Sequence, residues 1–122
     1  MDQAEPAFSI DDVFAGSSFT VRGIYERLVD ALRPIGPIAE EPREGGVALA
    51  AGRDMFAECA PRGDRLLLDI RSADVIANGR IRRIGMGEDG LFRNELLLAS
   101  VNDVDEELLG WLHHARDTVA GR

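Results

Sequence analysis

Three charged side chains, those of Glu58, Asp69 and Arg71, are predicted to share one face of a β-sheet. Side chains alternate between the two faces of a strand, so the same face also carries Phe56 and several aliphatic residues. A mixed face of this kind can bind a ligand or a protein partner, with Arg71 contacting an anion. The alternative is structural: Arg71 is neutralised by Asp69 or Glu58, and residues 73–93 or a second copy cover the face.

A second candidate for chemistry is a local excess of arginine: Arg80, Arg82, Arg83 and Arg93 fall within fourteen residues. Guanidinium groups bind phosphate, so this segment is a candidate anion contact and the basis of an alternative function, a phosphate- or nucleic-acid-contacting module. The formal net charge of the whole chain is −8 at pH 7, which disfavours nucleic acid as a partner. The structural alternative is a solvated connection between strands.

Other motifs give no catalytic, metal-ligating or cofactor-binding residue. Gly85 to Gly90 spells G-x-G-x-x-G, but a dinucleotide site needs a helix after the glycines, whereas the following residues read as a strand. The segment therefore predicts a hairpin turn. His113 and His114 are adjacent on a helix and point about 100° apart, which is poor geometry for one shared metal. Cys59 is expected in the core, where a thiol is usually inert packing. Because none of these motifs supplies a catalytic residue, we lean towards a protein that is not an enzyme.

Composition indicates one small domain. The chain has 122 residues, 45% of them hydrophobic, which suits a single domain with one core. It has one cysteine, so it can form no internal disulfide, which suggests a reducing compartment. Residues 1–7 read as a disordered tail and residues 8–120 as the domain. No apolar run approaches the length of a membrane span, so we expect a cytoplasmic protein without a membrane partner.

The elements that position these residues predict an α+β fold. A short helix follows Ser9, a longer one covers about 18–33, and the last helix begins with a capping box at Asp103 and Glu106. Between them we expect a mostly antiparallel sheet of about four to five strands, with the helices packed on one face. Three of these strands lie within residues 46–72, joined by tight turns. We assign to the helix-covered face Ala48, Ala50, Met55, Ala57, Cys59, Leu66, Leu68 and Ile70, and to the opposite face Val47, Leu49, Phe56, Glu58, Leu67, Asp69 and Arg71.

Several phrases of the chain resemble a small bacterial family, the domain of unknown function 5655. They are Val13-Phe14-Ala15-Gly16, Gly36-Pro37-Ile38, Gly52 to Ala57, Pro61-Arg62, Leu66 to Ile70, and Ser100 to Leu108 followed by Trp111, Leu112 and Ala115. The resemblance covers about residues 8–118. Asn94 stands where the family pattern leads us to expect histidine, and Arg116 where it leads us to expect tyrosine.

This resemblance implies a module found alone or at the end of longer bacterial proteins, with no established activity to carry over. It therefore favours a non-enzymatic binding or interaction module, with a protein partner or a homodimer as the expected assembly. The outline is also similar to small frataxin-like iron chaperones, which gives a metal-handling role as a further alternative. Glu41, Glu44 and Gly45-Gly46 replace the basic or aromatic residues expected near the first strand, which puts a family ligand site there in doubt.

Overall fold

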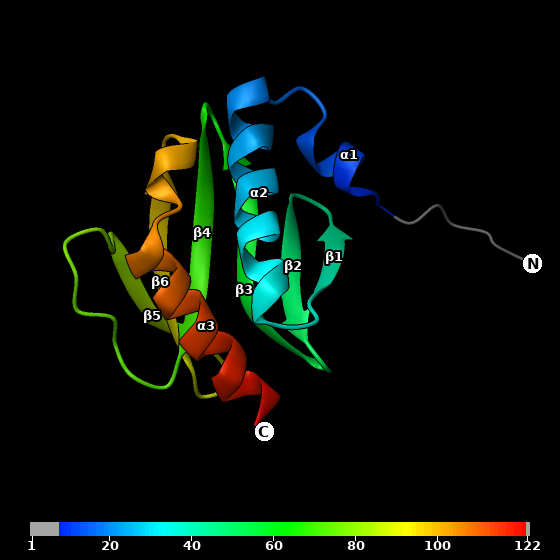
Figure 1. Cartoon of the computed structure of the whole chain (residues 1–122). Helices are drawn as coiled ribbons and strands as arrows, with labels where there is room; N and C mark the ends of the chain where they lie inside the picture. The colour runs from blue at the N-terminus through cyan, green and yellow to red at the C-terminus, as the bar shows by residue number, and fades with distance from the viewer. Residues whose placement is uncertain (1–7, 122) are drawn as a thin grey trace, which may run out of the picture.

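The structure is a computed structural model that describes residues 8–121; the predicted tail, residues 1–7, lies outside this range. Within residues 8–121 there are three α-helices and six strands (Figure 1). In chain order they are α1 (Ile10–Phe14), α2 (Phe19–Leu32), β1 (Ala39–Arg43), β2 (Gly46–Ala51), β3 (Asp54–Arg62), β4 (Arg65–Ser72), β5 (Arg83–Met86), β6 (Phe92–Leu98) and α3 (Glu106–Ala120). Short 3₁₀ turns occupy Arg33–Ile35 and Val101–Asp103.

The strands form one antiparallel sheet in the order β1-β2-β3-β4-β6-β5. Helices α2 and α3 lie side by side over one face of this sheet (Figure 1). The predicted α+β class, with N-terminal helices and a C-terminal helix on an antiparallel sheet, is confirmed. Because β6 lies between β4 and β5, residues 73–82 carry the chain past β6 before it turns back.

Local capping signals set most helix ends. The Ser9 hydroxyl accepts from the amide of Asp12, and the Ser18 hydroxyl accepts from the amide of Val21. The prediction for the last helix was wrong by two residues. Asp105 is its N-cap and accepts from the amide of Leu108, whereas Asp103 forms a capping box with Ser100 at the start of the preceding 3₁₀ turn.

A β-bulge corrects the predicted faces of the sheet. Ala50 pairs with Met55, as tight-turn geometry requires, but Leu49 pairs with Ala57, so β3 contains one extra residue, Phe56. An insertion of one residue exchanges the faces of everything beyond it. As a result Val47, Leu49 and Phe56 belong to the core beneath the helices, while Ala48, Ala50 and Met55 lie outside it, opposite to the prediction.

The other assignments of residues to the two faces in β3 and β4 are confirmed, although the two strands pair two residues away from the register that a two-residue turn at Arg62-Gly63 would give. Cys59 pairs with Leu68 and Ala57 with Ile70, all four inside the core, while Glu58 pairs with Asp69 on the other face. The edge strand β1 was not anticipated, because its sequence Ala39–Arg43 is polar and contains a proline. Such a composition is typical of an exposed edge strand.

Candidate functional site

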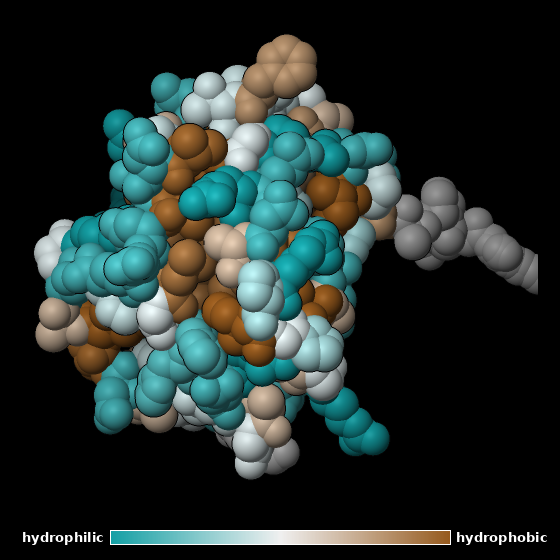
Figure 2. All heavy atoms as spheres, in the orientation of Figure 1, coloured by the Kyte–Doolittle hydropathy of each residue, from teal (hydrophilic) through white to brown (hydrophobic). Residues whose placement is uncertain are grey.

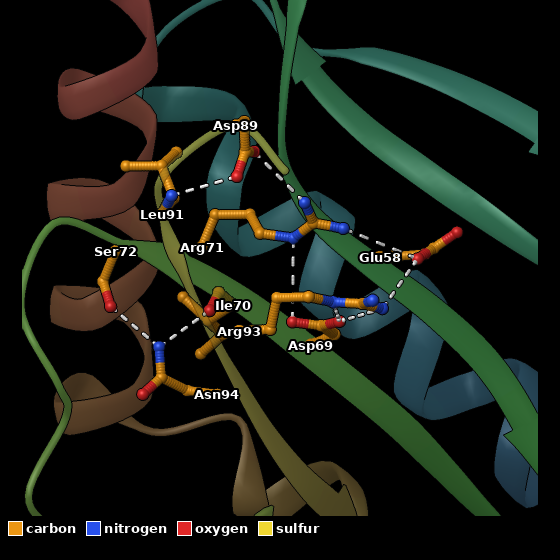
Figure 3. Close-up of polar contacts among 9 residues, drawn as sticks. All are labelled: Glu58, Asp69, Ile70, Arg71, Ser72, Asp89, Leu91, Arg93 and Asn94. Atoms are coloured by element: carbon orange, nitrogen blue, oxygen red, sulfur yellow. Dashed lines mark hydrogen bonds and ion pairs between the residues drawn. The ribbon is translucent and has the colours of Figure 1, made fainter. Parts of the chain in front are cut away.

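The face of the sheet opposite the helices carries a compact ionic cluster. Arg93 on β6 donates from Nε and Nη2 to Oδ2 of Asp69 on β4, at 2.9 and 2.8 Å (Figure 3). Arg71 lies beside this pair, with its guanidinium 3.3 Å from Asp89, 3.8 Å from Asp69 and 3.9 Å from Glu58. Glu58 is also 4.0 Å from Arg93 and completes the cluster.

Charge within this cluster is already compensated. Arg71 and Asp69 are only 8% and 7% exposed, so each is held among opposite charges rather than presented to solvent. The hydrogen bond from Arg93 to Asp69 raises the pKa of the Arg93 guanidinium, as expected for a close ion pair. The structure therefore brings Glu58, Asp69 and Arg71 together as predicted and adds Arg93. The arrangement matches the structural alternative for Arg71, since carboxylates from three segments surround it.

Phe56, which the sequence analysis also assigned to this candidate face, is not part of it. Its side chain is fully buried in the core, because the bulge turns it towards the helices.

Most arginines of the second candidate site are held in separate ion pairs, and only Arg83 and Arg93 line a common hollow, together with Asp69 and Glu95. Arg80 reaches α3, where it donates to Asp105 and Glu107 and to the carbonyl of Asp103, with its guanidinium 5.7 Å from the centre of the Trp111 ring. Arg82 lies 3.8 Å from Glu95, and Arg93 is bound to Asp69. Among the described residues only Arg83 of this set has no ion-pair partner. These arginines therefore form no common anion-binding patch.

Asn94 is the residue that fixes the connection between β4 and β5. It is completely buried on β6 and donates from Nδ2 to the Ile70 carbonyl at 2.9 Å and to the Ser72 hydroxyl at 2.7 Å (Figure 3). Its Oδ1 accepts from the Ile76 amide at 3.1 Å. The end of β4 and the segment beyond it are thereby tied to β6.

With the segment held in this way, a cleft of about 330 Å³ opens between residues 74–78 and α3. The connection contributes Asp74, Val75, Ile76, Ala77 and Asn78, the helix contributes Glu107, Trp111 and His114, and Ser72 completes the lining. This volume lies in the range of small-molecule sites. An indole, an imidazole and two carboxylates therefore meet in one concave site.

The polar groups of this cleft differ from those of the hollow beside α2. A larger hollow beside α2, about 410 Å³, is lined by groups that pair with one another, such as Tyr25 with Glu40 and Arg22 with Glu26. In the cleft, Glu107 accepts from Asn78 and Arg80, but Asp74 and His114 have side chains without a hydrogen-bond or ion-pair partner in residues 8–121. These two groups remain available to a ligand.

Sequence reasoning missed this cleft. The sequence analysis considered His114 only together with His113, which points elsewhere and lies 3.5 Å from Asp117. The only sequence signal was the position of Trp111 and His114 three residues apart, which puts them on the same side of a helix.

Within residues 8–121 no helix is both long and apolar enough to cross a bilayer, and no three His, Cys, Asp or Glu side chains are grouped to hold a metal ion. Cys59 is fully buried, and burial raises the pKa of its thiol. The thiol is therefore protonated and serves as part of the packed core.

No protein-family model, curated protein or solved structure matches the chain. The resemblance to the domain of unknown function 5655 accordingly stays a prediction.

Proposed function

We propose that this protein is a non-enzymatic binding module whose ligand site is the cleft between residues 74–78 and α3. The observation that carries the proposal is the convergence of Trp111 with the two unpaired groups, Asp74 and His114, in a concavity of ligand size. The ionic cluster around Asp69 is a weaker candidate, because each of its charged groups already lies within 4.0 Å of an opposite charge.

The chemistry of the lining favours an organic cation, such as the arginine or lysine side chain of a partner peptide. Asp74 and Glu107 supply negative charge, and the Trp111 ring supplies an aromatic face. The protein itself already holds a guanidinium in this environment, since Arg80 lies over Trp111 and donates to Glu107. A ligand cation would bind beside Arg80 and pair with Asp74.

The hydrogen bonds of the Ser72 hydroxyl, which lines the cleft, support binding rather than catalysis. Ser72 is buried, donates its proton to the backbone carbonyl of Asp74 and accepts from Asn94. A serine that is saturated in this way has no base to activate it as a nucleophile.

Trp111 is the only tryptophan of the sequence, so its fluorescence reports directly on the cleft. We expect N-acetyl-arginine amide to change this fluorescence saturably, with a dissociation constant on the order of millimolar for so small a probe. N-acetyl-glutamate amide should have no effect at the same concentrations. The Asp74→Asn variant should weaken arginine binding by up to about fivefold, the equivalent of one exposed ion pair.

Asp117→Asn serves as the matched control, because Asp117 is an exposed carboxylate on α3 that does not line the cleft. It should bind the arginine probe like the parent chain. Equal responses to both probes, or equal losses in Asp74→Asn and Asp117→Asn, would contradict the proposal.

A further inference from the structure

The edge strand β5 is unprotected in residues 8–121. It pairs only with β6, and all four of its residues, Arg83–Met86, are exposed. The opposite edge, β1, carries Pro42 and two glutamates, which discourage further pairing. In contrast β5 has no proline and presents Ile84 at 44% and Met86 at 60% exposure.

The outward-facing backbone of β5 can be identified from its register. Gly85 pairs with Arg93, and the Gly87 amide donates to the Leu91 carbonyl as the hairpin closes. Since hydrogen bonding alternates along an antiparallel strand, the amides and carbonyls of Ile84 and Met86 point away from β6. Two donors and two acceptors are therefore free for another strand.

The sequence of β5 is complementary to itself. If a second β5 pairs antiparallel with its centre at Gly85, Ile84 of each copy lies opposite Met86 of the other, in positions that exchange backbone hydrogen bonds. The exposed apolar side chains then cover each other. The same register brings Arg82, before the strand, towards Glu88, after it, so opposite charges meet at both ends.

Gly85 itself points to this arrangement. Its φ is not positive, and a Cβ added at this position would meet nothing within 4 Å, so the single chain does not require glycine here. Glycine inside a strand weakens it and often marks a site where another backbone approaches closely. At the centre of a two-fold pairing, Gly85 would face its own copy in the narrow pair, where the Cα atoms are about 4.5 Å apart.

We propose that two copies of this chain associate through β5, antiparallel about a two-fold axis at Gly85, and join their sheets into one. The helix-covered side is a poorer partner surface, because its apolar patches are interrupted by hydrophilic side chains (Figure 2). The dimer leaves the cleft between residues 74–78 and α3 untouched and does not depend on the proposed ligand. Two four-residue strands make a small interface, so we expect a dissociation constant on the order of micromolar.

Sedimentation velocity of the full chain from about 5 to 500 μM tests this association. The mass should rise from 13.3 kDa towards twice that value as concentration increases. Ile84→Glu and Met86→Glu each place a charge opposite an apolar side chain of the other copy, and both variants should remain monomeric. Val101→Glu, at an equally exposed position (46%) far from β5 in the chain, should dimerise like the parent. A chain that stays monomeric at 500 μM, or a dimer that persists in both β5 variants, would overturn the proposal.

A disulfide gives a second, independent readout. Gly85→Cys should oxidise to a covalent dimer, because the expected Cα separation suits a disulfide and the added side chain meets nothing within the chain. Buried Cys59 should not compete. Val101→Cys is the control and should cross-link only at the slow rate of random collision; equal rates for the two variants would refute the two-fold axis at Gly85.

Discussion

Replacing Asn94 with alanine should destabilise the protein and release the segment that forms one wall of the cleft. The Asn94 side chain makes three hydrogen bonds, to the Ile70 carbonyl, the Ser72 hydroxyl and the Ile76 amide, and it is completely buried. Each such bond contributes about 1 kcal/mol net, so the free energy of unfolding should fall by about 3 kcal/mol. For a chain of this length, that corresponds to a decrease in Tm of roughly 10 °C.

Urea unfolding measures the global loss, and amide hydrogen exchange locates it. The Ile76 amide loses its acceptor, so its exchange in Asn94→Ala should accelerate more than that of amides in the centre of β3 or β4. Asn102→Ala is the control, because Asn102 is exposed and should change stability by no more than about 0.5 kcal/mol. The reasoning would be refuted if Asn94→Ala unfolded within about 0.5 kcal/mol of the parent chain with unchanged exchange at Ile76.

Three further predictions test other parts of the structure. Leu49→Ala should lower the free energy of unfolding by about 2–5 kcal/mol, because Leu49 is fully buried beneath the helices, whereas Leu67→Ala on the open face should lower it clearly less. Equal decreases for the two variants in urea unfolding would contradict the bulge. Asp105→Ala should cost about 1 kcal/mol at neutral pH by removing the N-cap of α3. Hydrogen bonds from the Leu108 amide, and then from Arg80, lower the Asp105 pKa in the folded protein. The stability that the cap contributes is therefore complete above the ordinary aspartate pKa of about 3.9 and should disappear as pH falls through the folded-state pKa. A difference in stability between variant and parent that persists in stronger acid would argue against the cap. Arg80→Gln should lower the free energy of unfolding by about 1–2 kcal/mol and change the fluorescence of Trp111. A double-mutant cycle with Glu107→Gln that shows no coupling energy would contradict the contact between Arg80 and Glu107.

The features predicted correctly from the sequence are those decided by neighbours along the chain. The short helix begins after Ser9 because the Ser9 hydroxyl accepts from the amide three residues on. The β5–β6 hairpin turns at Glu88 to Gly90, where Gly90 has a φ of 82° that glycine adopts without strain. Both kinds of signal act over about four residues, so the sequence alone contains them.

The faces of β2 could not be predicted in the same way. Its assignment depended on an uninterrupted register with β3, and the extra residue at Phe56 shifts that register by one. Nothing local to β2 reveals the insertion, because Val47, Ala48, Leu49 and Ala50 are all apolar and either alternation would bury aliphatic side chains. The error carried Phe56 into the predicted binding face, although the charged residues of that face were placed correctly.

The cleft and the open β5 edge have one cause in the topology. Because β6 is inserted between β4 and β5, residues 73–82 must cross the end of β6. Asn94 anchors the start of this crossing and Arg80 anchors its end on α3, so the segment spans the space between them and encloses the cleft. The same insertion places β5 outermost, where only β6 supports it. A ligand in the cleft would therefore stabilise the segment that leads into β5, while pairing at β5 would fix the other end of that segment. The two proposed binding events lie on opposite sides of Arg80, and Arg80→Gln is the variant that should weaken any coupling between them.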